Sequence, residues 1–436
     1  MVLLQRLDLS KRSSLFYIFF FHDTSKTSLY RINRRNITAF QLNDQQLEGI
    51  KKIIKWYFSE TYNKHWHVVS GVAGSGKSTI VSIAIKMLGI PLQNVIFCTL
   101  TGKASLVLRI KGNPSNTIHK TFYSVFKTKN SFGFHLKKHI DPTIKLIVVD
   151  EAAMVPQPMV EDILSFGTPV LFLGDHNQLP PIFGPNKIMV PEMCDTRLTQ
   201  VMRQSDSSGI LILANMAIQG LPIKLGQYNA SKVVRYSDIY DKMHEYDMII
   251  TYSNGTRRVV NHLVRQQLGR KSIYPEKGDK LICLMNNYNY QIEYEDIPIY
   301  VINGLVGYAE TPSKTITDGS LELCNFEFVP EFLPNEPQYR FNIKCFMEIF
   351  EQYSKDIRKE AFIQAMYDDS VDEEKLGSIA MVDYGYAITC HKSQGSEAKN
   401  VLVLASDFRG SQDTYNKWLY TAVTRAKESV TIAFDI

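Results

Sequence analysis

One segment of the chain has the residue types and the spacing that hold a nucleotide phosphate. It runs from Gly71 to Ser78 as Gly-Val-Ala-Gly-Ser-Gly-Lys-Ser, after an apolar stretch and before a helical pattern over 79–88. Its glycines let backbone N–H groups close around phosphate oxygens, and the helix N-terminus adds a positive dipole end. Lys77 would neutralise the β and γ phosphates, and Ser78 would offer its hydroxyl to Mg²⁺. We therefore predict ATP and Mg²⁺ as cofactors, held by Gly71, Ala73, Gly74, Ser75, Gly76, Lys77, Ser78 and Thr79.

Two adjacent carboxylates follow a second apolar stretch. Asp150 and Glu151 come directly after Leu-Ile-Val-Val at 146–149. Because open α/β sheets bind ligands at the carboxyl ends of their strands, both acids should reach the phosphate site. Asp150 would hold Mg²⁺ through water together with Ser78. Glu151 would position and deprotonate the attacking water.

A third apolar stretch, 169–173, runs into the turn Gly-Asp-His-Asn-Gln-Leu-Pro-Pro at 174–181. The neutral amide of Gln178 could contact the γ-phosphate or the attacking water, and so sense whether hydrolysis has occurred. A turn that contains Gly, Asp and Pro is also simply a turn, so this pattern leaves both readings open.

The elements that must position these residues are short apolar runs rich in Val and Ile. Such runs are typical of strands buried on both faces of a parallel sheet, and helical patterns separate several of them into βαβ units. Two groups of runs predict two α/β lobes. Residues 280–380 are irregular and aromatic-rich, which indicates an inserted β module. The expected strands are 66–69, 95–100, 144–149, 170–173, 248–252 and 401–405.

Seven further segments complete an ordered pattern: 42–46, 99–104, 115–119, 198–204, 252–257, 386–397 and 419–427. Taken with the three segments above, they resemble the superfamily 1B helicases of the RecD/Dda-like branch, nearest to the phage Dda type. The resemblance covers residues 40–436. It implies two RecA-like P-loop lobes with parallel sheets, a pin insertion in the first lobe and an SH3-like β insertion in the second.

The resemblance assigns further residues to the nucleotide. It implies that Gln46 reads the adenine base, although Asn43 and Gln46 also match a capping box at a helix start, and both roles can hold. Arg203 and Arg425 would reach across the cleft to the γ-phosphate and stabilise charge in the transition state. Gly395 and Glu397 would lie near the nucleotide.

The resemblance also implies contacts with DNA. Residues 127–138 occupy the place of the strand-separating pin, with a turn expected at 130–134. Phe132 or Phe134 would stack on the terminal base pair, although an aromatic side chain in a hairpin is as often local packing. The expected DNA-contact residues are Thr101, Lys103, Thr117, His119, Phe132, Phe134, Asn254, Thr389 and His391.

The implied domains are an N-terminal extension of unclear role (1–37), a first lobe (38–190) with its pin at about 111–142, a second lobe (191–279 and 381–436) and the insertion (280–380). The implied activity is an ATP-driven helicase that translocates 5′-to-3′ on single-stranded DNA and separates duplex strands. One alternative is a DNA-stimulated ATPase that remodels nucleoprotein without unwinding. Another is a P-loop kinase or nucleotidase with no nucleic-acid role.

Composition sets wider limits. The 436 residues are 44% hydrophobic and 21% charged, which excludes a wholly disordered chain. The net charge of +5 is unevenly distributed, because residues 1–37 hold seven Lys/Arg and two Asp/Glu, and residues 101–140 hold eight Lys/Arg and no acid. That basic segment favours a phosphate backbone. The six cysteines form no CxxC pair, so neither a zinc site nor a redox pair is indicated.

The remaining expectations concern partners and location. We expect single-stranded DNA and a duplex fork as substrates, and a single-stranded-DNA-binding protein or other replication, recombination or repair proteins as candidate partners. No run of eighteen apolar residues is present, so no membrane association is expected. The scattered cysteines favour a reducing cytosol, expected to be that of a bacterium or of a phage-infected host. We also expect a monomer.

Overall fold

The structure is a computed structural model that describes residues 15–20, 28–33, 42–59, 64–128, 131–200, 208–318, 321–351 and 373–435. The chain divides into two compact units, residues 1–48 and 49–436. In the first unit, β1 (Leu15–Phe20) pairs antiparallel with β2 (Ser28–Asn33), with Leu15 opposite Asn33. The apolar N-terminal run therefore forms a strand with a partner of its own.

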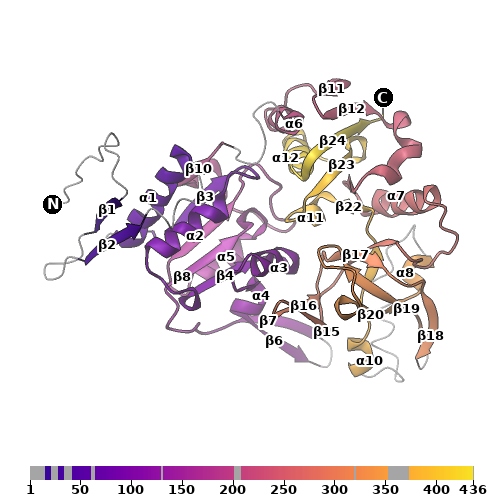
Figure 1. Cartoon of the computed structure of the whole chain (residues 1–436), viewed down its shortest axis with the longest axis horizontal. Helices are drawn as coiled ribbons and strands as arrows, with labels where there is room; N and C mark the ends of the chain where they lie inside the picture. The colour runs from indigo at the N-terminus through magenta and orange to yellow at the C-terminus, as the bar shows by residue number, and fades with distance from the viewer. Residues whose placement is uncertain are drawn as a thin grey trace. The chain divides into compact units, whose positions relative to one another are not determined.

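The first lobe contains a six-stranded sheet in which every pairing is parallel. Its central strands β8 and β9 are buried except at Asp150, the last residue of β8, because apolar side chains on both faces of the sheet pack into the core. Figure 1 draws this sheet in indigo to magenta. The strands, in spatial order, are β10 (Thr196–Leu198), β3 (Trp66–Gly71), β9 (Val170–Gly174), β8 (Leu146–Asp150), β4 (Val95–Thr99) and β5 (Ser115–Thr117).

The second lobe contains another six-stranded sheet, parallel except for its edge strand β11. The strands expected at 248–252 and 401–405 lie side by side in it, so the predicted fold class of two parallel-sheet lobes is confirmed. In spatial order the strands are β11 (Gly226–Tyr228), β12 (Ser231–Arg235), β24 (Ala426–Phe434), β23 (Ala398–Leu404), β13 (Met248–Thr251) and β22 (Ala387–Thr389).

The aromatic-rich segment inserted in the second lobe forms an antiparallel sheet with its own apolar core. Its strands are β14 (Lys280–Cys283), β17 (Val306–Ala309), β18 (Lys314–Asp318), β19 (Leu321–Pro330), β20 (Phe341–Phe346) and β21 (Val382–Tyr384). A separate antiparallel pair, β15 (Asn287–Tyr294) and β16 (Ile297–Val301), shares the core of this sheet, and a second pair, β6 (Tyr123–Thr128) and β7 (Ser131–Leu136), belongs to the first lobe.

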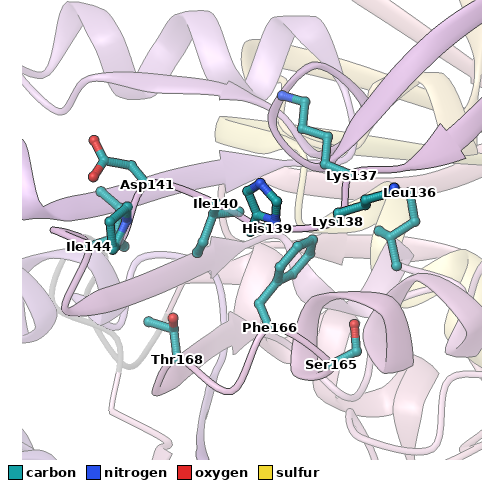
Figure 2. A pocket seen from close by; sticks show the side chains of 11 residues that line it. Leu136, Lys137, Lys138, His139, Ile140, Asp141, Ile144, Ser165, Phe166 and Thr168 are labelled. Carbon is teal, nitrogen blue, oxygen red and sulfur yellow. The ribbon is translucent and has the colours of Figure 1, made fainter.

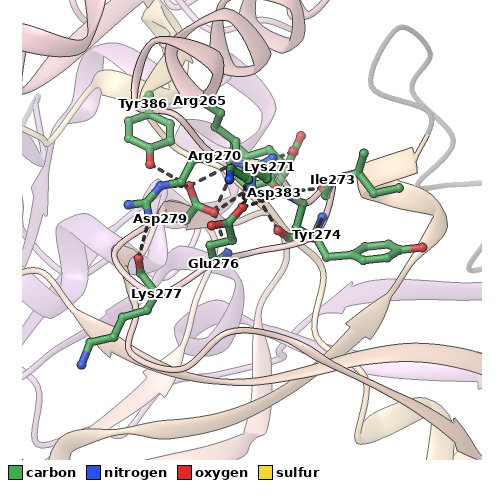
Figure 3. A network of polar contacts seen from close by, with 12 residues as sticks. Arg265, Arg270, Lys271, Ile273, Tyr274, Glu276, Lys277, Asp279, Asp383 and Tyr386 are labelled. Carbon is green, nitrogen blue, oxygen red and sulfur yellow. Dashed lines mark hydrogen bonds and ion pairs between the residues drawn. The ribbon is translucent and has the colours of Figure 1, made fainter.

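A buried network of charges joins the insertion to the second lobe (Figure 3). Asp279, which is fully buried, accepts hydrogen bonds from Arg265 (3.0 Å) and from the Tyr386 hydroxyl (2.8 Å). Nearby, Arg257 forms an ion pair with Asp383 at 2.8 Å. Because a buried charge that loses its partner destabilises a fold strongly, this network fixes the insertion on the lobe that carries it.

The helices are α1 (Asp44–Phe58), α2 (Lys77–Met87), α3 (Gly102–Ile110), α4 (Ile118–Phe122), α5 (Gln157–Leu164), α6 (Gly209–Ile218), α7 (Asn254–Gln267), α8 (Glu348–Glu351), α10 (Glu373–Gly377), α11 (Cys390–Ser393) and α12 (Gln412–Val423). Among the helices of the described ranges, none has the length and apolar character needed to cross a membrane. All six cysteines are free thiols; five are buried, and Cys194 is half-buried.

Candidate functional site

The segment from Gly71 to Ser78 forms a closed loop between β3 and α2. Gly74 and Gly76 have φ angles of 77° and 86°, the left-handed region that glycine adopts without strain. A side chain at Gly71 would meet Ser75 Oγ at 2.5 Å, so the loop has no room for one there. The Lys77 ammonium donates to the Gly71 carbonyl at 2.6 Å and to the Val72 carbonyl at 3.2 Å. The loop therefore has the shape of a phosphate cradle with its cation inside it.

Strand β8 brings the predicted carboxylates to this loop. Ser78 Oγ lies 3.4 Å from Asp150 Oδ2, so one cation could contact both groups. Burial raises the pKa of Asp150, while a hydrogen bond from the Glu151 backbone and the charge of Lys77 act in the opposite direction. A carboxylate that is costly to bury is well suited to a cation, and these two residues fit Mg²⁺. Within the described residues no group of three His, Cys, Asp or Glu could hold a metal ion.

Glu151 occupies a special backbone position. Its φ is 52°, a left-handed conformation that is strained for a residue other than glycine. Burial and the adjacent Asp150 charge raise its pKa, whereas Arg425 and Lys77 lower it. The positive charge of Arg425, from the second lobe, therefore favours the ionised form of the Glu151 carboxyl group in the first lobe.

Arg425 is held in place by its own lobe. Its guanidinium is buried and donates to the carbonyls of Thr421 (3.0 Å) and Ser396 (3.4 Å) and to the Thr424 hydroxyl (3.1 Å). These bonds fix the orientation of the Arg425 guanidinium within the second lobe. The other predicted finger, Arg203, lies outside the described residues.

The turn after β9 places Gln178 at the boundary between the lobes. Its side chain is buried, and Gln394 Nε2 from the second lobe lies 3.5 Å from its Oε1. Gln394 belongs to the same segment as the predicted nucleotide residues Gly395 and Glu397. Gly395 has a φ of 73°, and a side chain there would lie 3.5 Å from Ala104 of α3. Glu397 forms a 3.7 Å ion pair with Lys427.

The segment expected to read adenine forms the capping box at the start of α1. Gln46 Oε1 accepts from the Asn43 backbone N–H at 3.1 Å, and Asn43 Oδ1 accepts from the Gln46 N–H at 2.8 Å. The helix-capping role considered for Asn43 and Gln46 is therefore present in the structure. An adenine contact by Gln46 stays a prediction.

Several predicted DNA-contact side chains cap helices. Thr101 Oγ1 accepts from the Ala104 N–H and begins α3, and Thr117 Oγ1 accepts from the Lys120 N–H and begins α4, both at 3.3 Å. Asn254 is exposed at the start of α7, directly after a capping serine. Sequence reasoning missed these caps, although Ser or Thr before a helical stretch is the usual sign of one.

The remaining predicted contacts from the second lobe flank the short helix α11. Thr389 is the residue at its N-terminal cap and is buried. His391 lies inside it, and burial lowers its pKa, which favours the neutral ring. A neutral imidazole or a threonine hydroxyl can hydrogen-bond a phosphate but supplies no charge.

Lys103 is half-buried where the insertion covers the start of α3. Burial lowers its pKa to about 8, Glu331 of the insertion acts in the opposite direction, and Lys280 lowers it further. A side chain at the preceding Gly102 would meet Ile302 Cβ at 3.0 Å. The contribution of the insertion to this predicted contact site was missed, because no local pattern in the sequence connects the two segments.

The expected pin is a two-stranded hairpin, but its turn is not at 130–134. Thr128 pairs with Ser131, so Phe132 and Phe134 lie on β7. Phe134 packs on His119 at a ring distance of 4.9 Å and on Tyr123 at 6.4 Å, and 43% of its surface is exposed. The side chain of Phe132 lies outside the described residues.

Part of the basic segment 101–140 makes structural contacts. Lys120 lies over the rings of Tyr288 (5.5 Å) and Tyr300 (5.9 Å) of the insertion. Arg109 donates to the Pro298 carbonyl at 2.8 Å, and Lys137 to the Thr121 carbonyl at 2.7 Å. The local positive charge is thus used partly to dock the insertion on α3 and α4.

A groove of about 500 Å³ lies where β7 ends, facing the loop after α5 (Figure 2). The rings of His139 and Phe166 lie together in its middle, and the exposed Lys138 borders it. The groove is separate from the phosphate loop, because it lies at the opposite end of the sheet, where β8 and β9 begin.

Comparisons with known proteins agree with this geometry. Residues 41–238 match the profile of an AAA domain, and residues 384–433 match that of a UvrD-like helicase C-terminal domain. The ATP-dependent RecD2 DNA helicase of Deinococcus radiodurans is 25% identical over 372 residues, covering 83% of this chain and 46% of that protein. Uncharacterized protein R530 of Acanthamoeba polyphaga mimivirus is 23% identical, covering 88% of this chain and 98% of that protein.

A solved structure has the same fold: Bacteroides Pif1 bound to single-stranded DNA gives a TM-score of 0.51 at 16% identity, covering 91% of this chain and 93% of that one. The two parallel-sheet lobes, with a phosphate loop in one and a buried arginine from the other, define a P-loop nucleotide-binding motor core. The two profile matches and the similarity to RecD2 support the expected resemblance to the superfamily 1B helicases. That the phage Dda type is nearest stays a prediction.

Proposed function

We propose that this chain is an ATP-dependent DNA helicase that moves 5′-to-3′ along single-stranded DNA and separates duplex strands. The observation that carries the proposal is the convergence of Lys77, the Ser78–Asp150 pair and Glu151 of the first lobe with Arg425 of the second. A site divided between two lobes can convert nucleotide binding and hydrolysis into lobe movement.

Each residue has a distinct part in the proposed hydrolysis. Lys77 and the backbone of the loop bind the phosphates, and Glu151 orients the attacking water and accepts its proton. Gln178 contacts the γ-phosphate, and Arg425, joined by Arg203, stabilises charge that develops on it. Mg²⁺, when bound at Ser78 and Asp150, neutralises phosphate charge.

We propose that DNA lies across the starts of α3, α4, α7 and α11. The backbone N–H groups of a helix start face phosphates without reading sequence, and Asn254 and His391 add side-chain donors. The proposed domains are two lobes, an SH3-like insertion in the second lobe and an extension at 1–37. The first lobe was expected to end at 190 and the insertion at 380, but β10 pairs with β3 of the first lobe and β21 pairs with β14 of the insertion. These two boundaries therefore move to about 198 and 384.

Because the phosphate loop and Arg425 belong to one chain, one copy supplies both lobes of the proposed site, which supports a monomer. The cytosol of a bacterium or of a phage-infected host, where ATP and DNA forks coexist, is the proposed location. Single-stranded-DNA-binding protein and other replication or recombination proteins are the proposed partners.

The test combines ATP hydrolysis with strand displacement. We expect hydrolysis to rise on adding single-stranded DNA, and a duplex with a 5′ tail to be unwound while one with a 3′ tail is not. RNA in place of DNA gives the nucleic-acid preference. Unwinding from the 3′ tail alone would overturn the polarity, and hydrolysis unaffected by either nucleic acid would favour a nucleotidase.

One observation favours a second candidate, an ATPase that remodels nucleoprotein without unwinding. Phe134, the described aromatic residue of the expected pin, packs on His119 and Tyr123. If the double variant Phe132→Ala, Phe134→Ala hydrolyses ATP and unwinds like the wild type, the pin assignment is wrong. If the double variant still hydrolyses ATP but no longer unwinds DNA, the pin assignment is supported.

A further inference from the structure

The two lobes meet in a short set of buried bonds that lies beside the ATP site. The Tyr420 hydroxyl of α12 donates to Asp175 Oδ2, in the turn after β9, at 2.6 Å. Both residues are buried, with exposed fractions of 2% and 1%. Burial and the Asp175 charge raise the pKa of Tyr420 well above its ordinary value, so the phenol remains a proton donor.

A second bond crosses the boundary between the lobes, from a residue four positions further along the turn to the next residue of α12. The Leu179 backbone N–H of the turn donates to Thr421 Oγ1 at 2.9 Å. The same hydroxyl donates to the Lys417 carbonyl at 2.7 Å, and the Thr421 side chain is fully buried. The hydroxyl of Thr421 is thus engaged on both sides, as an acceptor from the first lobe and as a donor within its own helix.

These bonds continue to the arginine. The Thr421 carbonyl accepts a hydrogen bond from Arg425 Nε at 3.0 Å. The charge of Arg425 in turn lowers the pKa of Glu151. At the other end, Gln178 directly precedes Leu179 in the turn. A continuous path of hydrogen bonds therefore runs from the residue next to Gln178, through α12, to the guanidinium.

We propose that Asp175, Tyr420 and Thr421 are positioning residues that hold α12 on the turn after β9, and so set where Arg425 stands relative to the reacting phosphate. This proposal deepens the proposed function and rests on it. If the turn after β9 moves when Gln178 contacts or releases the γ-phosphate, the movement would reach Arg425 through two hydrogen bonds. One joins Leu179 to Thr421, and the other joins Thr421 to Arg425. The contact between the lobes and the position of Arg425 for ATP hydrolysis would then both depend on α12.

The test uses three variants that remove or keep single groups. Thr421→Val has nearly the same shape but cannot accept from Leu179, and we expect kcat for ATP hydrolysis to fall by about 10²-fold, since a misplacement of about 1 Å can cost that much. Tyr420→Phe removes one bond and should lower kcat by about 10-fold. Thr421→Ser keeps the hydroxyl and should restore wild-type kcat.

The readout that separates positioning from stability is the division between kcat and KM. Loss of an interaction made only in the transition state lowers kcat and kcat/KM together and leaves KM for ATP nearly unchanged. Tyr415→Phe is the matched control, because it removes a hydroxyl from the same helix but keeps the ring contacts with Phe408 and Trp418. It should match the wild type.

Wild-type kcat in Tyr420→Phe, or a fall in Thr421→Ser as large as in Thr421→Val, would overturn the proposal. If Thr421→Val does not fold, Tyr420→Phe alone decides. Unwinding is measured separately on the wild-type chain. A wild type that hydrolyses ATP but unwinds nothing would sink the helicase proposal and still leave the positioning test readable in its hydrolysis.

Discussion

The proposed nucleotide site and the segments proposed to contact DNA (the DNA-facing segments) use similar residue types in different ways. Around the phosphate loop, the side chains named by their pattern point at one another: Lys77 lies inside its loop, and Ser78 meets Asp150 at 3.4 Å. Along the DNA-facing segments, Thr101 and Thr117 are occupied in capping helices.

The difference teaches that the geometry of the two kinds of motif is set in different ways. A phosphate cradle is built by one loop and its helix, so its geometry follows from neighbouring residues. A surface that grips a backbone without reading bases needs several helix starts aligned from separate strands. There, a threonine can matter because it shapes the start of a helix, with the backbone making the contact.

The largest effect that would separate the two regions is expected at the phosphate loop. Lys77→Ala should lower kcat for ATP hydrolysis by about 10²- to 10³-fold, because no other described ammonium lies inside the loop. Steady-state hydrolysis checks this. Lys86→Ala, an exposed lysine in the last turn of the same helix, should leave the rate unchanged. Equal losses in both variants would contradict a specific phosphate role.

The next effect concerns acid stability beneath the nucleotide site. Burial lowers the pKa of His67 on β3 to about 4. Below pH 6.5, His67 is therefore protonated in the unfolded chain while it stays neutral in the folded chain. The contribution of His67 to the free energy of unfolding is therefore highest above pH 6.5 and should fall by about 2 kcal/mol as the pH is lowered from 6.5 to 5. Urea unfolding measures it. His67→Gln should lose this part of the pH dependence, and the exposed His65→Gln should keep it.

A smaller effect tests whether the DNA-facing threonines are caps. Thr101→Val should lower the free energy of unfolding by about 1 kcal/mol, because α3 loses its cap, whereas Thr101→Ser should retain stability. Chemical denaturation of both variants gives the difference. If Thr101→Val weakened DNA binding with stability unchanged, the side chain would be a direct contact and the contrast between the regions would narrow.

The smallest effect should come from an exposed contact. Asn254→Ala should weaken single-stranded DNA binding by about 3- to 10-fold, as expected for one lost hydrogen bond, with no change in stability. Fluorescence anisotropy with labelled DNA measures the affinity. Gln266→Ala, exposed near the other end of α7, is the control. An unchanged affinity for Asn254→Ala would remove this helix start from the proposed DNA path.

The sequence by itself determined the parallel strands and the phosphate loop. Both follow from short-range patterns: Val- and Ile-rich runs for strands buried on both faces, and glycine spacing for the loop that closes on Gly71. The closeness of Ser78 and Asp150 could also be predicted, since the carboxyl ends of parallel strands share one edge.

Only the tertiary structure decided what the basic segment does. The placement of Arg109 and Lys120 against the insertion depends on strands nearly two hundred residues away, which no local spacing encodes. The bonds from Asp175 to Tyr420 and from Leu179 to Thr421 join segments more than two hundred residues apart in the same way. Local geometry is set by neighbouring residues, whereas contacts between lobes are set by how whole sheets pack.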